Sequence, residues 1–286
     1  MPPPKSRNPM PRRGSLLLLL LALAATAVAA QCRPLILMTN DDGAGAPGLE
    51  AIYRQLKDVA DIYVVAPAET QSGVSHPIDT YDPIYVKPYA IDGQTVGCSV
   101  ATTPATCVIM GLEVFLPRTP DLVVSGINRG SNPGAVSLLS GTVAAARQAA
   151  LRGVKAIALS VDVTDPPNYD AFAAAVKPLI VRMLTAALPA ETFLNVNGPA
   201  LAVYPKGLLV TKASRVELMW QYERVTNIRG RDLYWVKGVL DPRSYPADTD
   251  WGAMQAGYIS VTPMTWSYDH GIDLDALARG LELPKK

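Results

Sequence analysis

Two adjacent carboxylates, Asp41 and Asp42, follow directly after the apolar run Leu35 to Thr39. Side chains alternate between the two faces of a strand, so a strand that continued here would point the carboxylates apart. Gly43 and Gly45 let the backbone turn beyond the run, and both carboxylates can then face one point. Two carboxylates at one point repel each other unless a proton or a cation lies between them. Oxygen ligands of this kind suit Mg²⁺, Mn²⁺ or Ca²⁺, so the pattern indicates a divalent-metal site, although an Asp-rich turn or helix cap explains this motif equally well.

Three further polar segments come after predicted strands or at the start of a predicted helix, and these are Gln71 to His76, Gly126 to Gly134 and Ser140 to Thr142. The carboxyl ends of parallel strands meet at one edge of a sheet, where ligands bind, so we expect these segments beside Asp41. At Ser140 to Thr142 the free backbone N–H groups and the helix dipole favour a phosphate. A plain Ser or Thr N-cap is the commoner explanation of that motif when it is taken alone. The convergence of four polar segments on one edge favours a ligand site.

Short apolar runs alternate with helical patterns between Arg33 and about residue 190. Continuous apolar runs of this length are typical of buried parallel strands. We predict strands over Leu35 to Thr39, Ile62 to Ala66, Leu122 to Ser125 and Ala156 to Val161. We predict helices over Pro47 to Val59, Pro104 to Phe115, Gly141 to Leu151 and Tyr169 to Leu188. The alternation predicts an α/β fold in which a mostly parallel sheet is covered by helices on both faces.

The segment from about 191 to 286 has a different pattern, with several predicted strands or hairpins and few helices among them. These strands are expected over Phe193 to Val196, Leu208 to Lys212, Arg215 to Tyr222, Leu233 to Gly238 and Tyr258 to Pro263. We interpret this segment as an antiparallel extension or an oligomer contact of the same domain. The predicted organisation is therefore a signal peptide over 1–30 and a single domain over 31–286, whose core spans about 33–190.

Basic residues, an apolar core and a tract of small residues follow one another within residues 1–30. This order predicts a secretory signal peptide that is cut near Ala29 or Ala30, and hence an exported protein without a membrane contact after cleavage. The apolar core, Leu16 to Leu23, is short for a membrane anchor, which needs about 20 residues. Arg12 and Arg13 ahead of this core leave both the general secretory and the twin-arginine route open.

Composition and charge exclude several other classes of protein. The net charge is +1, and the Lys and Arg residues are scattered without interleaved aromatics, so we expect no nucleic-acid duplex as a partner. Cys32, Cys98 and Cys107 cannot form a dense disulfide framework, although they allow one bridge whose pairing the spacing does not decide. The only histidines are His76 and His270, which excludes a Cys/His zinc pattern.

Three other chemistries fit the motifs less well. Gly43 to Gly48 matches G-x-G-x-x-G after a strand, but the second strand runs into Ala66 and Pro67, where a dinucleotide site would need an acidic residue for the ribose. Asp41 and Asp42 would also repel a pyrophosphate there. The sequence contains no G-x-S-x-G elbow for a serine hydrolase. A haloacid-dehalogenase-type phosphatase needs acidic residues two apart on its first loop, so the adjacent aspartates do not support an aspartyl nucleophile.

A set of motifs in a fixed order extends from about Arg33 to Thr265. They are Thr39 to Gly43, Ala46 to Gly48, Val65 to Pro67 with Ser72 and Gly73, Thr103 and Pro104 with Cys107 and Val108, Pro120 to Asn128 with Gly130, Asn132 and Gly134, Ser140 to Ala145, Asn195 to Asn197, and Gly257 to Pro263. Each motif alone is modest, whereas the complete set at this spacing is highly specific. The set resembles the SurE family, the metal-dependent 5′/3′-nucleotidases that are also called survival protein E.

The resemblance implies a Rossmann-like three-layer α/β/α fold, whose C-terminal hairpins and helix exchange between the subunits of a homodimer or homotetramer. It also implies that the chain hydrolyses nucleoside monophosphates to nucleoside and phosphate with one divalent cation per subunit, Mg²⁺ or Mn²⁺, with Ca²⁺ as a further candidate. The implied metal ligands are Asp41, Asp42, Ser72 and Asn128, and the two aspartates are also the implied catalytic residues. The implied contacts to substrate and phosphate are Asn40, Asn132, Ser140, Gly141 and Thr142.

Several positions depart from the usual pattern of the family. Thr106, Leu139 and Gln148 stand where Asp, Tyr and Glu are usual, which leaves base preference and turnover open. One alternative is therefore an exported protein that binds nucleotides or metal with little catalysis, and another is an acid phosphatase of broad specificity. His76, close to Ser72 in sequence, is either a proton donor to the leaving group or a structural histidine.

Overall fold

The computed structural model describes residues 33–162, 168–200, 205–267 and 273–281. The chain divides into two units, Met1–Arg33 and Pro34–Lys286, and the described elements belong to the second. The predicted signal peptide, Cys32 and His270 lie outside the described residues. Within the described ranges, no helix combines the length and the apolar character that a membrane crossing requires.

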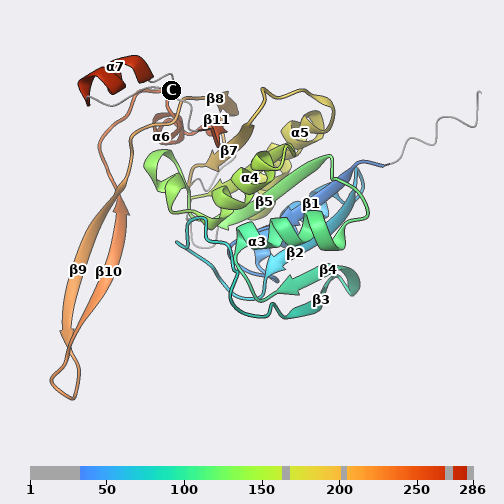
Figure 1. The fold of residues 1–286 in the computed structure, drawn as a ribbon, viewed down its shortest axis with the longest axis horizontal. Helices are drawn as coiled ribbons and strands as arrows, with labels where there is room; N and C mark the ends of the chain where they lie inside the picture. Colours follow the sequence, from blue (N-terminus) through green and yellow to red (C-terminus); the bar gives the residue numbers. More distant parts are fainter. Residues whose placement is uncertain (1–32, 163–167, 201–204, 268–272, 282–286) are drawn as a thin grey trace, which may run out of the picture. The chain divides into compact units, whose positions relative to one another are not determined.

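The central element is a nine-stranded sheet with the strand order β3-β4-β2-β1-β5-β6-β7-β11-β8 (Figure 1). The strands from β4 to β7 run parallel to their neighbours, whereas β3 is antiparallel to β4 and β11 is antiparallel to β7. This arrangement confirms the predicted mostly parallel sheet. The strands are β1 (Leu35–Thr39), β2 (Asp61–Pro67), β3 (Val86–Ile91), β4 (Gln94–Val100), β5 (Leu122–Arg129), β6 (Ala156–Val161), β7 (Thr192–Gly198), β8 (Leu208–Val210) and β11 (Ile259–Thr265).

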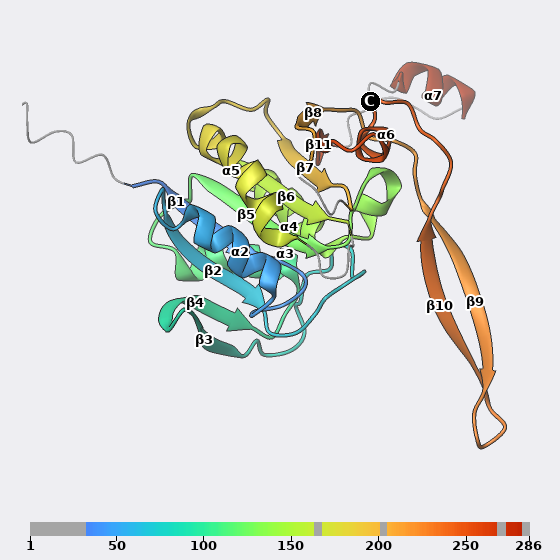
Figure 2. The same ribbon diagram turned by 180° about the vertical axis from the view of Figure 1, so that it is seen from behind.

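Helices cover both faces of this sheet. The helices α2 (Pro47–Leu56) and α5 (Tyr169–Thr185) pack together on one face, and α3 (Pro104–Met110) and α4 (Gly141–Leu151) pack on the other (Figures 1 and 2). Two separate apolar cores result, one that contains Ile52 and Val176 and one that contains Val108 and Val143. Because both faces are covered, β1 and β6 are buried along their whole length and are apolar without strict alternation.

An antiparallel hairpin of β9 (Leu218–Thr226) and β10 (Asp232–Leu240) forms the second sheet and extends away from the large one (Figure 1). Its two strands pair from Leu218 opposite Leu240 to Thr226 opposite Asp232. This confirms the predicted antiparallel hairpin. The neighbouring strands β7 and β11 lie in the large sheet, although they fall within the segment that the sequence assigned to the extension.

Several boundaries differ from the prediction for identifiable reasons. The strand β5 continues to Arg129 instead of ending at Ser125, because Asn128 and Arg129 pair again with β6 after an irregularity in the ladder. The predicted helix over residues 104–115 ends as α3 at Met110 and continues as a π-helical turn over Gly111–Phe115. The sequence did not predict β3, β4, α6 (Asp250–Gln255) or α7 (Leu274–Gly280).

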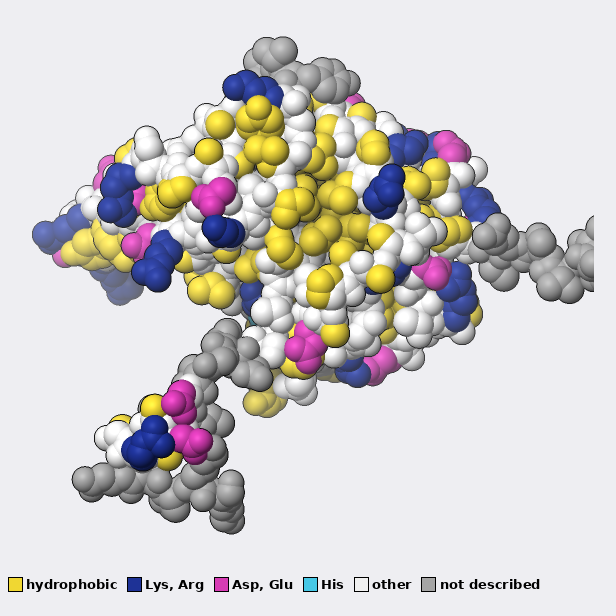
Figure 3. All heavy atoms as spheres, turned by 90° about the horizontal axis from the view of Figure 1, so that it is seen from above, with side chains coloured by type: hydrophobic (Ala, Val, Ile, Leu, Met, Phe, Trp, Pro, Cys, Tyr) yellow, Lys and Arg dark blue, Asp and Glu magenta, His cyan; other side chains and the backbone are white. Residues whose placement is uncertain are grey.

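The described cysteines form no disulfide, because Cys98 and Cys107 are both free thiols and both buried. Burial raises the pKa of the Cys107 thiol, which keeps it protonated. On the face shown in Figure 3, acidic and basic side chains are interspersed among hydrophobic and polar ones. This face therefore does not present the broad basic patch that is typical of a nucleic-acid partner.

Gly48→Ala is expected to destabilise the protein by about 2 kcal/mol or more, because α2 approaches β5 too closely for a side chain. A Cβ atom at position 48 would lie 2.0 Å from the Ile127 carbonyl oxygen and 3.0 Å from the Tyr169 ring. Chemical denaturation measures the loss.

Gly280→Ala is the matched control, because nothing lies within 4 Å of a Cβ atom at that position in α7. We expect its free energy of unfolding to change by no more than about 0.5 kcal/mol. Equal stability of the two variants would contradict the close approach of α2 to β5.

Candidate functional site

The predicted aspartates lie where the strand order of the sheet reverses. The strand β1 pairs with β2 on one side and with β5 on the other, with Thr39 opposite Ser125 at its carboxyl end. Crossovers that leave in opposite directions open a crevice beyond the ends of such strands, and ligands of α/β proteins bind there. Asp41 and Asp42 follow β1, and Asn128 belongs to the end of β5. The topology therefore brings three of the four predicted metal ligands to one crevice.

A cavity of about 590 Å³ opens at this edge of the sheet. Pockets that hold small molecules are typically of this size. The cavity is walled by the ends of β1 and β5, by the segment after β2, by the start of α4 and by the base of the β9–β10 hairpin. Of the residues predicted for the site, it is lined by Asp41, Ser72, Asn128, Asn132 and Ser140.

Asp41 is the most deeply enclosed charged group of the site, with only 2% of its surface exposed. Its carboxylate accepts hydrogen bonds from the Thr142 backbone N–H, at 3.1 Å, and from the Thr142 hydroxyl. Burial and the neighbouring charge of Asp42 raise the pKa of Asp41 to about 6, although the bonds from Thr142 lower it in part. Gly141 makes this approach possible, because a Cβ atom there would lie 2.9 Å from the Cβ of Asp41.

Asp42 is held at the end of β5. Its Oδ2 accepts a hydrogen bond of 3.0 Å from the backbone N–H of Arg129. Burial raises the pKa of Asp42, while this N–H and the positive charge of Arg129 lower it in part. Two carboxylates that both lose hydration on folding, and that repel each other, favour a cation between them.

The side-chain amides of Asn40 and Asn128 are held by backbone turns. Asn40 Nδ2 donates to the Gly43 carbonyl at 2.8 Å, and Asn128 Nδ2 donates to the Gly130 carbonyl at 2.6 Å. Because the NH₂ group of each amide donates to the backbone, the amide carbonyl oxygens are the atoms that can accept a hydrogen bond or coordinate a cation. The Oδ1 atom of Asn40 is buried and has no hydrogen-bond partner among the described residues.

Ser72 is placed by two hydrogen bonds that brace its loop. The Gln71 N–H donates to the Asp41 carbonyl at 2.7 Å, and the Ser75 N–H donates to the Leu139 carbonyl at 2.9 Å. The loop is thus tied to the β1 end on one side and to the segment before α4 on the other. The Ser72 hydroxyl lies 3.1 Å from the Thr70 hydroxyl and lines the cavity.

The donor set fits a hard divalent cation. Two carboxylates, a hydroxyl and an amide carbonyl offer only oxygen, which Mg²⁺, Mn²⁺ and Ca²⁺ prefer. Within the part of the chain that the structure describes, no three His, Cys, Asp or Glu side chains gather in a metal-binding cluster. Any cation here would therefore depend on the neutral oxygens of Ser72 and Asn128 in addition to the aspartates.

The predicted phosphate contacts have partners within the protein. Ser140 is the N-cap of α4 and accepts from the Val143 N–H at 3.2 Å, while Thr142 donates to Asp41. Asn132 Nδ2 donates to the Ser160 hydroxyl at 2.9 Å. The contact of these residues with phosphate stays a prediction, and in this structure they also build the frame of the site.

Two asparagines of β7 hold the loop that carries Asn132. Asn197 Oδ1 accepts from the Asn132 N–H at 2.7 Å, and Asn195 Nδ2 donates to the Asn132 carbonyl at 2.9 Å. Asn195 and Asn197 belong to one of the sequence motifs, but no role was predicted for them. Their spacing was an available signal, because residues two apart on a strand share one face.

Asp250 fixes the same loop and was missed entirely. This fully buried residue accepts from the Gly134 N–H at 2.7 Å, the Ser214 N–H at 2.8 Å and the Trp251 N–H at 2.7 Å. It therefore joins the loop after β5 to the C-terminal half of the chain. No clear signal in the sequence indicated this role, because α6, the short helix that begins at Asp250, was not predicted.

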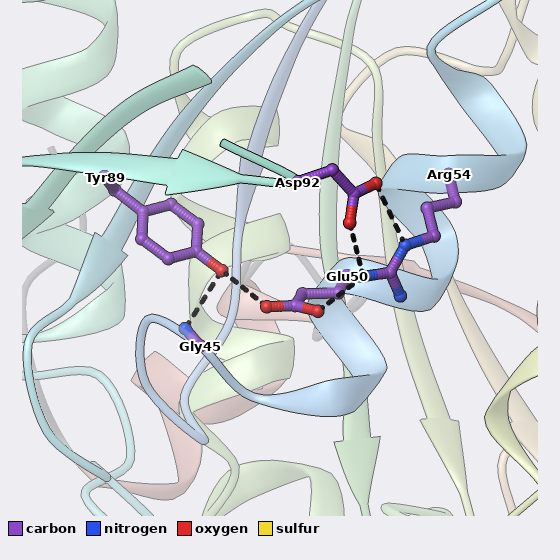
Figure 4. Close-up of polar contacts among 5 residues, drawn as sticks. All are labelled: Gly45, Glu50, Arg54, Tyr89 and Asp92. Carbon is purple, nitrogen blue, oxygen red and sulfur yellow. Dashed lines mark hydrogen bonds and ion pairs between the residues drawn. The ribbon is translucent and has the colours of Figure 1, made fainter. Parts of the chain in front are cut away.

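A polar network braces the outer side of the aspartate loop (Figure 4). The Gly45 N–H donates to the Tyr89 hydroxyl at 3.0 Å, and this hydroxyl lies 3.5 Å from a carboxylate oxygen of Glu50. Arg54 joins Glu50, at 2.7 Å, to Asp92, at 3.2 Å. The unpredicted strand β3 thereby contacts the loop that carries Asp41.

His76 lies outside the cavity wall and bonds with a neutral partner. Its Nε2 is 2.9 Å from Gln148 Oε1, and burial lowers its pKa. Burial therefore favours the neutral form of the imidazole. This arrangement supports the structural interpretation of His76 over its interpretation as a proton donor, which would require the charged form.

Comparison with known proteins identifies the family of this chain. A sequence model described as "Survival protein SurE" matches residues 36–219, which contain every residue predicted for the site. The chain belongs to the SurE family.

Relatives with the name "5'-nucleotidase SurE" include one from Symbiobacterium thermophilum, 41% identical over 234 residues, which covers 80% of this chain and 91% of the relative. Another relative, from Nitratidesulfovibrio vulgaris, is 40% identical over 245 residues. This match covers 85% of this chain and 98% of the relative. The crystal structure of the SurE protein from Aquifex aeolicus superposes with a TM-score of 0.76 at 31% identity, over 87% of this chain and 100% of that one.

Asp41→Asn is expected to stabilise the metal-free protein at about pH 8. A carboxyl whose pKa rises from 3.8 to about 6 on folding binds its proton more tightly in the folded state. The stability that the protonated Asp41 carboxyl contributes is therefore lost as the pH rises through this range. The complete loss is on the order of 3 kcal/mol in the free energy of unfolding. Thermal unfolding in chelator should show wild-type stability falling between about pH 4 and 6 relative to the variant.

Asp58→Asn removes an exposed carboxylate after α2 and serves as the control for the loss of one negative charge. Added Mn²⁺ should raise the unfolding temperature of the wild type and of Asp58→Asn, but not that of Asp41→Asn. A lower metal-free stability for Asp41→Asn at every pH would contradict the cost assigned to the buried charge.

Proposed function

We propose that the protein is a metal-dependent 5′-nucleotidase, a phosphomonoesterase that hydrolyses nucleoside monophosphates to nucleoside and phosphate. The observation that carries this proposal is the buried carboxylate of Asp41, which lines a cavity of about 590 Å³ with neutral oxygen donors, and the half-buried carboxylate of Asp42 next to it in the chain. The relatives named 5′-nucleotidase SurE support the substrate class, because the matched stretch contains the whole predicted site.

Asp41, Asp42, Ser72 and Asn128 would hold one divalent cation, Mg²⁺ or Mn²⁺, with Ca²⁺ as a further candidate. Such an ion supplies charge stabilisation at a phosphoryl oxygen and acidifies a bound water. The two aspartates would provide its counter-charge. The four ligands come from the loops after β1 and β2 and from the end of β5. Hydrogen bonds already join these segments, so the protein would hold the ligands in place before the substrate arrives.

The phosphate would lie beside the start of α4. Ser140 lines the cavity there, and the helix dipole favours negative charge at this end. Asn132, on the loop after β5, lines the same cavity. We assign Asn40, Asn132 and the segment Ser140–Thr142 to orienting the substrate and its phosphate.

The decisive assay is phosphate release from nucleoside monophosphates with Mn²⁺, with chelator, and in Asp41→Asn. We expect chelation to abolish turnover and the substitution to lower kcat by orders of magnitude, because it removes one of two anionic ligands. Asp58→Asn should retain wild-type turnover. Undiminished activity of Asp41→Asn would overturn the mechanism.

The same assay separates the two alternatives. Calorimetric binding of nucleotides without phosphate release at saturating Mn²⁺ would indicate a binding protein in which Thr106, Leu139 and Gln148 have removed catalysis. Equal turnover of nucleotides, sugar phosphates and polyphosphate would indicate a phosphatase of broad specificity. A clear preference for nucleoside monophosphates supports the proposed activity.

The hairpin supports a homodimer or a homotetramer. It exposes large apolar side chains, including those of Tyr222, Tyr234, Trp235 and Val236. Large exposed apolar side chains of this kind are costly in water and, when they gather, typically mark an interface between proteins. A second copy of the chain is the partner that the family fold suggests.

We also propose that the protein is exported and acts without its first 30 residues, on the strength of their basic, apolar and small-residue order. Expression of the full chain in a bacterial host should deliver a periplasmic or secreted protein whose mass corresponds to a start near Gln31. Light scattering of that product should give two or four subunits. An uncleaved, cell-associated product or a monomer would contradict the corresponding proposal.

A further inference from the structure

One wall of the catalytic cavity is aromatic and comes from the hairpin. Trp220, the third residue of β9, lines the same cavity as Asp41, Ser72 and Asn128. It follows directly after the stretch that matches the family, which ends at residue 219. Its place in the site therefore comes from the structure and not from the family motifs.

The indole is held in position by a glycine on the opposite strand. Gly238 pairs with Trp220, and a Cβ atom at position 238 would lie 3.3 Å from Cζ3 of the indole. The six-membered ring thus lies against the bare backbone of β10. Despite this support the side chain is 52% exposed, so much of its surface is free to meet a ligand.

The cavity is mainly polar at the sheet edge and mainly apolar at the hairpin base. The oxygen donors belong to the loops at the sheet edge, where Val136 and Leu139 also line the cavity, whereas the hairpin base contributes Leu218, Trp220, Val239 and Leu240 together with the charged Lys237. A nucleoside monophosphate has the same division, with a charged phosphate at one end and a flat base at the other. Aromatic side chains bind bases by stacking and tolerate different bases, because every base has a π-face.

We propose that Trp220 is a specificity-determining residue that stacks on the base of the nucleotide while the phosphate lies at Asp41. This inference rests on the proposed nucleotidase function and extends it to the base. It assigns selectivity for nucleotides over base-free phosphate esters to the hairpin, and it predicts weak discrimination among bases.

The test compares adenosine 5′-monophosphate with ribose 5-phosphate in Trp220→Ala, with Mn²⁺ present. Loss of stacking should lower kcat/KM for the nucleotide about tenfold or more, mainly through KM, and leave that for ribose 5-phosphate unchanged within about twofold. Trp220→Phe keeps an aromatic ring. It should therefore retain most of the wild-type ratio of kcat/KM for the nucleotide to kcat/KM for ribose 5-phosphate.

Trp235→Ala is the matched control. Trp235 and Gly238 are three positions apart on β10, and side chains alternate along a strand, so Trp235 projects from the opposite face of the hairpin. Trp235 is 69% exposed and does not line the cavity. We expect this variant to keep the wild-type ratio. A ratio unchanged in Trp220→Ala, or lowered equally in Trp235→Ala, would overturn the proposal.

Calorimetric binding of adenosine 5′-monophosphate to chelator-treated protein separates this proposal from the proposed function. If the wild type hydrolyses neither substrate but Trp220→Ala still weakens nucleotide binding about tenfold, the nucleotidase proposal fails and the stacking role stands. If hydrolysis is normal but Trp220→Ala binds like the wild type, the stacking role fails alone.

Discussion

The site depends on a carboxylate that a distant segment of the chain holds inside the protein. Asp41 accepts both the backbone N–H and the hydroxyl of Thr142, 101 positions away in sequence. These bonds compensate only part of the lost hydration, because the pKa of Asp41 still rises to about 6. A negative charge that is held in place but only partly compensated favours the binding of a cation. Asp42 adds a second carboxylate next to Asp41.

The remaining frame serves to keep that arrangement fixed. The loops after β1 and β2 and the end of β5 hydrogen-bond to one another and to the start of α4, so Asp41 and Asp42 are each held by a segment other than their own. Asn195, Asn197 and Asp250 then fix the β5 loop from the far half of the chain. Positions held in this way need little reorganisation when a ligand binds, which favours both affinity and rate.

Sequence reasoning succeeded where local pattern decides structure. The bounds of β1, β6 and α4 agree with prediction, because continuous apolar runs and a Ser N-cap are local signals. It missed β3, a largely exposed edge strand that contains Pro88, and it ended β5 before the ladder resumed at Asn128. Trp220 lines the cavity because of where the hairpin base lies in the fold. The periodicity of the sequence does not predict that position.

The central claim is that Asp41 and Asp42 bind one cation together with Ser72 and Asn128. Crystals grown with Mn²⁺ and measured at the manganese absorption edge test it most directly, because anomalous scattering locates the ion independently of activity. We expect a single strong peak per subunit within direct coordination distance of these four side chains. A peak elsewhere, or aspartates that point apart with no ion between them, would contradict it.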